Sequence, residues 1–289
     1  MFTKTYIFAD RAVRITAGEP FADTAETARF LASSTAAPVV EVTVDASASV
    51  PAPPPEHTLL GGRVAMWRVG DEVFRAGFSF KLSARPTTPF SLSRRRGNVV
   101  RVCFDAARVA SPDARMILEA AGLADIMIEL GCTVLHSSYV LHRGQGLIFC
   151  GPSGTGKSTQ AELWHQYAGA EVINGDRTLM RPTERGVDAC GVIYCGTSGI
   201  CYDRTAPVRA IMLISHGGEE LAAPAAPRTA FRALLSQMTY NIGDPEAVAK
   251  ATAICADIVS RVPVLSLSCR PDAAAVEYLQ NYLGRLDNL

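Results

Sequence analysis

One short run of residues constrains this chain more than any other feature. Residues 151–158 read Gly-Pro-Ser-Gly-Thr-Gly-Lys-Ser and fit the pattern G-x-x-x-x-G-K-[ST] of a phosphate-binding loop, or P-loop. Its glycines permit backbone conformations that other residues avoid, so successive N–H groups can surround phosphate oxygens. The apolar residues 147–150 predict a buried strand before the run, and Lys157 is expected to begin a helix after it. The sequence therefore predicts a strand, loop and helix that bind a nucleoside triphosphate.

The residue types of this motif indicate a role for each position. We expect the Lys157 ammonium group to reach the β- and γ-phosphates, and the Ser158 hydroxyl to ligate Mg²⁺. ATP and Mg²⁺ are therefore the predicted cofactors. The residues predicted to bind the nucleotide are Gly151, Ser153, Gly154, Thr155, Gly156, Lys157, Ser158 and Thr159.

Two candidate catalytic residues lie outside the loop. Asp176 follows a strand predicted over residues 170–174, at the end that faces the phosphate loop in a parallel sheet. It could bind Mg²⁺ through water or accept a proton from an attacking hydroxyl, and the alternative is a turn-forming aspartate after Asn-Gly. Arg177 could contact phosphate or pair with Asp176. His136 is a candidate catalytic residue, although an isolated histidine is more often structural.

Residues 1–110 are predicted to form a β-rich N-terminal domain. Residues 69–71 predict a hairpin turn, residues 46–55 predict a loop, and the basic cluster 94–97 fits either a solvated turn or a contact to phosphate or an acidic partner. The sequence leaves open whether this region covers the site, recognises an acceptor or forms an interface. Its strand-forming stretches are residues 6–15, 39–45, 64–68, 72–78 and 99–104.

Residues 111–289 are predicted to form a second domain, which contains the P-loop. Strands and helices alternate here, so the fold class is α/β with a mixed or mainly parallel sheet. Helices are predicted at residues 114–130, 157–167, 229–238, 244–259 and 272–284. Strands are predicted at residues 134–140, 146–150, 170–174, 192–195, 208–214 and 264–268.

Composition narrows the functional classes. The chain has 28 basic and 28 acidic residues, and this balance argues against a dedicated nucleic-acid-binding protein. No apolar run approaches the length of a membrane span, and the N-terminus has no signal-peptide pattern, so we expect a cytoplasmic protein without a membrane partner. The eight cysteines are expected to be reduced, and a zinc site at Cys190, Cys195 and Cys201 fits no common ligand spacing. A homo-oligomer is left open.

Three motifs in order resemble HPr kinase/phosphorylase. They are Leu-His-Ser-Ser at residues 135–138, the P-loop, and Ile-Asn-Gly-Asp-Arg at residues 173–177, and they are also similar to the nucleotide-binding part of phosphoenolpyruvate carboxykinase. The resemblance covers roughly residues 130–215. It implies a P-loop fold distinct from the Ras and ABC types, and phosphoryl transfer to a hydroxyl, which is a serine in HPr. It matches Lys157 and Ser158 to the P-loop pair, Asp176 to the second acid and His136 to the family histidine.

The chain departs from the family pattern at one decisive position. The first acid of the family pair, the expected catalytic base, falls on Gly175. Either Asp176 serves both roles, or another acid such as Asp188 or Asp203 supplies the base, or the protein binds nucleotide without fast transfer. The resemblance therefore leaves both a kinase and a nucleotide-binding regulator open.

The segment after the core strand also differs from the family. Residues 194–200 replace the segment that carries phosphorylase activity, so HPr is disfavoured as a substrate. The pattern looks more like divergent HPr-kinase-related proteins of bacterial gene clusters, some of which modify peptides. Residues 196–199 could form a loop that contacts the acceptor or phosphate, or a plain turn. The leading expectation is a kinase acting on a hydroxyl of a peptide, a protein or a small alcohol, ahead of a regulator and of carboxykinase-type chemistry.

Overall fold

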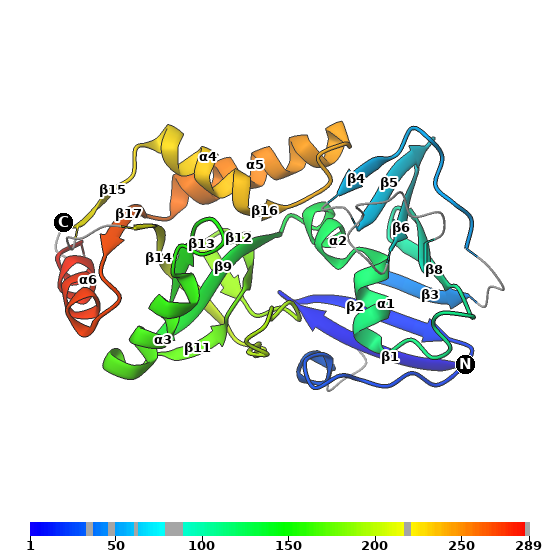
Figure 1. Cartoon of the computed structure of the whole chain (residues 1–289), viewed down its shortest axis with the longest axis horizontal. Helices are drawn as coiled ribbons and strands as arrows, with labels where there is room; N and C mark the ends of the chain where they lie inside the picture. Colours follow the sequence, from blue (N-terminus) through cyan, green and yellow to red (C-terminus); the bar gives the residue numbers. More distant parts are fainter. Residues whose placement is uncertain (33–36, 46–49, 61–62, 79–88, 217–220, 287–289) are drawn as a thin grey trace. The chain divides into compact units, whose positions relative to one another are not determined.

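The computed structural model describes residues 1–32, 37–45, 50–60, 63–78, 89–216 and 221–286 (Figure 1). Two compact units are present, one of Met1–Leu130 with Tyr240–Ala249 and one of Gly131–Thr239 with Lys250–Leu289. The fold is mixed α/β, as the sequence predicts. The domain boundary near residue 110 stays a prediction. By contacts, the helices that follow it lie with the first unit.

The first unit is built on one mixed sheet with strand order β1-β2-β3-β8-β7-β6-β5-β4 among its described residues. β3 pairs in parallel with β2 and β8, and the other neighbours are antiparallel. Residues 6–15 lie in a hairpin that turns at Ala9 and Asp10, and the hairpin around Gly70 is confirmed. The strands are β1 Phe2–Phe8, β2 Arg11–Ala17, β3 Val40–Asp45, β4 Thr58–Leu60, β5 Val64–Val69, β6 Glu72–Gly77, β7 Ser91–Arg96 and β8 Val99–Phe104.

Helices accompany this sheet. A 3-10 helix, η1 Thr27–Phe30, follows β2, and α1 Ala114–Ala121 packs on β6, β7 and β8. The single helix predicted over residues 114–130 is wrong, because the chain breaks at Gly122 into α1 and α2 Leu123–Glu129. Gly122 has φ +79°, a left-handed conformation that ends a helix. Of the predicted loop 46–55, residues 46–49 lie outside the described residues, and residues 50–55 form no strand or helix.

The basic cluster of residues 94–96 lies at the end of β7, beside a turn at Gly97. Each arginine faces an acidic side chain of the same unit. The pairs are Arg94–Glu72, Arg95–Glu129 at 3.4 Å and Arg96–Asp71 at 2.7 Å. These neighbours favour the reading of the cluster as part of a hairpin over its reading as a phosphate contact.

The second unit is organised around one long strand, β9 Thr133–His142. The first half of β9 pairs with β12 and β16, and its second half lies between β10 and β11. β14 pairs in parallel with both β10 and β17, so the sheet is mixed. The other strands are β10 Gln145–Cys150, β11 Glu171–Asn174, β12 Arg177–Thr183, β13 Gly186–Cys190, β14 Thr205–His216, β15 Leu221–Pro224, β16 Met238–Thr239 and β17 Val264–Cys269.

The helices predicted after residue 150 are confirmed with small shifts at their ends. They are α3 Lys157–Ala168, α4 Pro227–Gln237, α5 Pro245–Arg261 and α6 Ala273–Leu286. None of the helices in the described residues has the length and hydropathy that a bilayer crossing requires.

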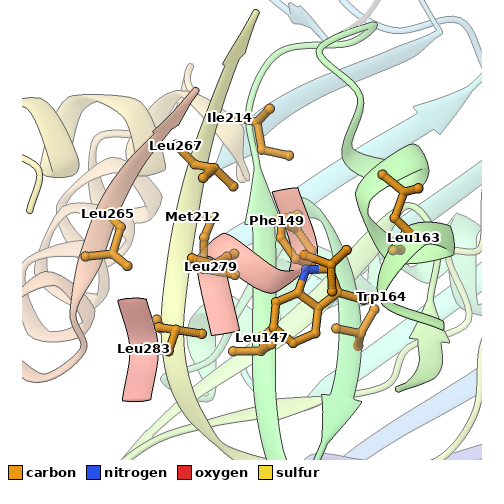
Figure 2. Packing of buried hydrophobic residues seen from close by; sticks show 14 of the residues in the cluster. Leu147, Phe149, Leu163, Trp164, Met212, Ile214, Leu265, Leu267, Leu279 and Leu283 are labelled. Atoms are coloured by element: carbon orange, nitrogen blue, oxygen red, sulfur yellow. The ribbon is translucent and has the colours of Figure 1, made fainter. Parts of the chain in front are cut away.

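An apolar core holds α3 and α6 against the sheet of the second unit (Figure 2). Trp164 of α3 is fully buried, and its ring centroid lies 6.2 Å from that of Phe149 on β10. Leu279 and Leu283 of α6 belong to the same cluster. A buried tryptophan contributes about 150–250 Å² of buried area, so this packing fixes α3 relative to β10. It thereby fixes both ends of the loop between them.

The strand predicted over residues 192–195 is wrong. Residues 191–200 form an irregular segment, and the strands on either side of it are β13 and β14. Val192, Ile193 and Cys195 are nevertheless almost fully buried. A short buried apolar run looks like a strand whether or not it pairs with a neighbour, which is why the pattern misled. The sequence patterns did not predict the hairpin formed by β12 and β13.

Candidate functional site

The loop motif of residues 151–158 follows β10 directly and ends in the first turn of α3, which begins at Lys157, as the sequence predicts. Gly154 and Gly156 have φ values of +84° and +95°, which side chains with a Cβ rarely adopt. A Cβ at either position would meet nothing within 4 Å. Backbone conformation, rather than lack of space, therefore requires glycine at both positions.

Lys157 is a buried cation inside this loop. Its side chain folds back, and Nζ donates to the carbonyl oxygens of Gly151 at 2.9 Å and Pro152 at 3.0 Å. The residue is only 7% exposed, and burial lowers the pKa of its ammonium group. Both of these partners are neutral carbonyls, which orient the ammonium group without cancelling its charge.

The N-terminus of α3 adds further donors beside Lys157. Gly156 is the N-cap residue and provides no side-chain cap, and the first turn contains no acidic residue. The first backbone N–H groups of a helix have no partner within the helix, and its dipole favours an anion there. Lys157, Ser158 and Thr159 form this first turn. The donor set of the loop therefore fits a phosphate group.

The carbonyl of Gly175 joins the loop to the strand that precedes Asp176. It accepts hydrogen bonds from Ser158 Oγ at 3.3 Å and from Ser138 Oγ of β9 at 3.0 Å. The backbone N–H of Ser137 donates to the carbonyl of Asp176 at 3.1 Å. These contacts bring the hydroxyl predicted to bind metal within one residue of the predicted acid.

The arrangement of the strands explains why Ser158 and Asp176 lie close together. It differs from the parallel sheet assumed from the sequence. β10 and β11 both pair antiparallel with β9, on opposite sides of it. They therefore run in the same direction and end at the same end of the sheet. Residues 151–158 leave β10 there, and Gly175 and Asp176 leave β11 there.

Asp176 lies between two cationic or ionisable side chains. Its Oδ1 is 3.4 Å from His136 Nε2, and its Oδ2 accepts from Arg177 Nε at 3.2 Å. The His136 contact, followed by the charge of Arg177, lowers the pKa of Asp176 although partial burial opposes them. Arg177 also donates to Thr239 Oγ1 at 2.8 Å. The pairing of Arg177 with Asp176 is thus observed, and the carboxylate remains one-third exposed.

A buried asparagine that the sequence analysis did not select holds this turn. Asn174 Oδ1 accepts from the backbone N–H groups of Asp176 at 3.0 Å and Arg177 at 2.9 Å. Its Nδ2 donates to the carbonyl of Val192 at 2.8 Å. Asn174 therefore fixes the direction in which Asp176 leaves the strand. The Asn-Gly-Asp sequence was the available signal, because asparagine side chains often bond to the backbone two residues later.

Of the comparisons with known proteins, only the one with solved structures gives matches, and the similarity described here is weak. No family model matches the chain, and no curated protein matches it. A solved structure described as Hpr(Ser) kinase/phosphatase from Coxiella burnetii aligns over 54% of this chain and 94% of its own, with 9% identity and a TM-score of 0.31. Similarity at this level assigns no activity.

The segment of residues 195–199 lies against Gly175 and Asp176. A Cβ at Gly175 would lie 2.4 Å from Ser198 Oγ, and a Cβ at Gly196 would lie 2.8 Å from Asp176 Cβ. Both distances are shorter than atoms tolerate, so the two glycines permit a close approach of this segment to the acid. Residue 175, where the sequence resemblance places an acid, therefore has no room for a side chain while Ser198 stays in place.

The other acids considered as a base are placed differently. Asp188 lies on β13 and pairs with Arg181 at 2.7 Å, and Asp203 is exposed. No group of three or more metal-binding side chains occurs among the described residues. Cys190, considered for zinc, is buried, which raises the pKa of its thiol to about 12. The structure gives the zinc interpretation no support.

Proposed function

We propose that this protein is an ATP-dependent kinase that transfers the γ-phosphate to a hydroxyl group. One observation supports this most directly: the Gly175 carbonyl accepts from Ser158 Oγ, and the next residue is the ionised Asp176. A phosphate-binding loop, a metal-binding hydroxyl and a carboxylate at one strand end are the parts that phosphoryl transfer requires. The acceptor would be a peptide or protein side chain or a small alcohol, and not a nucleic acid.

Each part of the proposed site has a physical role. Lys157 and the N–H groups of the loop and of the first turn of α3 would bind the triphosphate. Ser158 and Asp176 would hold Mg²⁺, which supplies positive charge against the phosphate oxygens when it is bound. Oxygen donors of this kind are the ligands that Mg²⁺ prefers. The chain thus contributes positioning and electrostatic stabilisation.

His136 acts in this proposal through Asp176. Its Nε2 is 3.4 Å from the carboxylate, and its place on β9 next to Ser137 and Ser138 ties it to the same turn. A ring that contacts the carboxylate restricts its orientation. We therefore propose that His136 positions Asp176 for the metal and the acceptor.

The alternative is a nucleotide-binding regulator with little transfer. Its support is that Ser198 occupies the space beside Gly175. Residue 175, where the sequence resemblance places the catalytic base, therefore carries no base. The two proposals share the loop and differ in what Asp176 must do. A kinase needs this carboxylate for turnover, whereas a regulator needs only the loop for binding.

Labelled γ-phosphate transfer with Mg²⁺ separates the two proposals. Wild-type protein would be assayed with extract fractions and candidate peptides as acceptors, beside Asp176→Asn and, as a matched control, Asp188→Asn. The kinase proposal expects acceptor-dependent label transfer that Asp176→Asn loses and Asp188→Asn keeps. Tight ATP binding with no transfer to any fraction favours the regulator, and loss of transfer in Asp188→Asn alone moves the base to β13.

A further inference from the structure

The chain carries its own hydroxyl next to the proposed site. Ser198 Oγ lies 2.4 Å from the position of a Cβ on Gly175, which places it within about 4 Å of the Gly175 Cα. The carbonyl of the same glycine accepts from Ser158 Oγ at 3.3 Å. Gly175 therefore separates the hydroxyl predicted to bind metal from a second hydroxyl, which the catalytic scheme above does not use.

The local structure presents Ser198 at the tip of a turn. Gly196 and Gly199 have φ values of +57° and +65°, and the two residues between them, Thr197 and Ser198, are exposed. Left-handed glycines on both sides allow this short segment to turn tightly against Asp176. Glycine on either side also gives this exposed tip conformational freedom that other residues lack.

The hydrogen bonds of Ser198 leave its oxygen able to react. Ser198 Oγ donates to the carbonyl of Cys195 at 2.7 Å and accepts from the backbone N–H of Ile200 at 3.2 Å. A serine hydroxyl has one donor and two acceptor positions, so one lone pair remains. The first bond directs the hydroxyl proton away from that lone pair, and the second holds the oxygen in place.

We infer that Ser198 is an acceptor of the site itself, so that the protein phosphorylates its own chain in cis. This inference rests on the proposed kinase function. A bond forms between Ser198 Oγ and the γ-phosphorus of ATP, while the bond from that phosphorus to the β–γ bridging oxygen breaks. ADP leaves, and the hydroxyl proton is released to water. Phosphoryl transfer has a loose transition state, so positioning matters more than prior removal of the proton.

The product would change the segment that carries it. A phosphoserine carries close to two negative charges at neutral pH, and it would lie beside Gly175, next in sequence to the carboxylate of Asp176. It would also lose the hydroxyl proton that Ser198 donates to Cys195. Both effects push the segment of residues 195–199 away from Gly175. Self-phosphorylation would thus open the space that Ser198 fills and expose the acid to an external acceptor.

The test uses the purified full-length chain with Mg²⁺ and ATP labelled on the γ-phosphate, with no added acceptor. Protein-bound label is counted, and mass spectrometry locates it. The variants are Ser198→Ala, Ser198→Thr, the neighbouring control Thr197→Ala, and Lys157→Ala as the background. Thermal melting checks that each variant folds, and calorimetry measures ATP binding in each.

The expected result is label on Ser198 of the wild type and of Thr197→Ala. Ser198→Ala should fall to the background of Lys157→Ala while it still binds ATP, and Ser198→Thr should carry label on the new hydroxyl. ATP binding without protein-bound label, or label that persists in Ser198→Ala, overturns the inference and leaves the proposed function standing. Absence of ATP binding by the wild type overturns the proposed function itself.

A mixing experiment tests whether transfer stays within one chain. Wild-type protein is incubated with a size-tagged Lys157→Ala chain, which offers Ser198 and lacks the ammonium group of the loop. Transfer in cis labels the untagged chain alone. Label on the tagged chain overturns the assignment to a single chain.

Discussion

Two cationic sites of this chain, the arginines of residues 94–96 in the first unit and Lys157 in the second, have different partners. In the first unit, each arginine of residues 94–96 faces a carboxylate. In the second unit, Lys157 is bonded to two carbonyls of its own loop and is largely buried. A carboxylate neutralises a cation, whereas a carbonyl only orients it. The positive charge of residues 94–96 is therefore paired within the first unit, whereas that of Lys157 stays available to an anion.

The largest expected effect concerns the packing that holds Lys157 in place. Trp164→Ala removes a fully buried ring from α3, so we expect a loss of about 3–5 kcal/mol in the free energy of unfolding. Trp67→Ala in the first unit is the matched control, because Trp67 is only partly buried, although it stacks on Phe74. Urea unfolding measures both. Equal losses would contradict the view that the core of the second unit anchors the loop.

The next effect compares the two kinds of cation directly. Lys157→Ala should weaken ATP binding by about 1.5–3 kcal/mol, since it removes charged hydrogen bonds to phosphate. Arg95→Ala should leave ATP affinity unchanged, because Arg95 faces Glu129. Calorimetry with MgATP measures both dissociation constants. Unchanged affinity in Lys157→Ala would mean that the loop does not bind the triphosphate.

A smaller effect on stability is expected when the pH is lowered. His136 and Arg177 lower the pKa of Asp176 in the folded protein, so the unfolded chain binds more protons at low pH. The contribution of Asp176 to the free energy of unfolding is therefore fully present above the unfolded-state pKa of about 3.9. It is lost as the pH falls through the lower pKa of the folded state. Asp176→Asn should flatten this part of the stability curve. Unfolding midpoints of the wild type and of Asp176→Asn would be measured from pH 6 downward. Parallel curves of midpoint against pH for the two proteins would refute the prediction.

The smallest effect belongs to the first unit. Arg96 and Asp71 form an exposed pair, and exposed pairs contribute little because water and salt screen them. Arg96→Ala should change the melting temperature hardly at all and should not alter ATP affinity. A clear loss of ATP binding in this variant would give the basic cluster a role in recognising phosphate, and the contrast between the two units would disappear.

The sequence predicted the parts of the site that depend on local order. Residues 151–158 follow a strand and lead into a helix as expected, because glycine spacing and strand ends are local features. The contact between Asp176 and His136 was not predicted, since His136 lies on β9 and Asp176 follows β11. The expectation that direct parallel pairing brings Asp176 to the loop was incorrect. Instead, β10 and β11 each pair antiparallel with β9, which lies between them.

Other parts could not be predicted because they depend on distant contacts. The segment of residues 192–195 is buried by its surroundings and has no strand partner, which a local pattern cannot reveal. The approach of Ser198 to Gly175 joins residues far apart in the chain, and neither residue signals it alone. The role of Asn174 required knowing that Val192 lies beside it.

The contact between Gly175 and Ser198 makes the two positions an epistatic pair. An aspartate placed at residue 175 would meet Ser198 Oγ, so Gly175→Asp alone should be poorly tolerated. A glycine at residue 198 removes the obstacle, and the double substitution should be better tolerated than the sum of its parts predicts. An acid at residue 175 therefore takes two coordinated changes, which substitutions made one at a time would not readily reach.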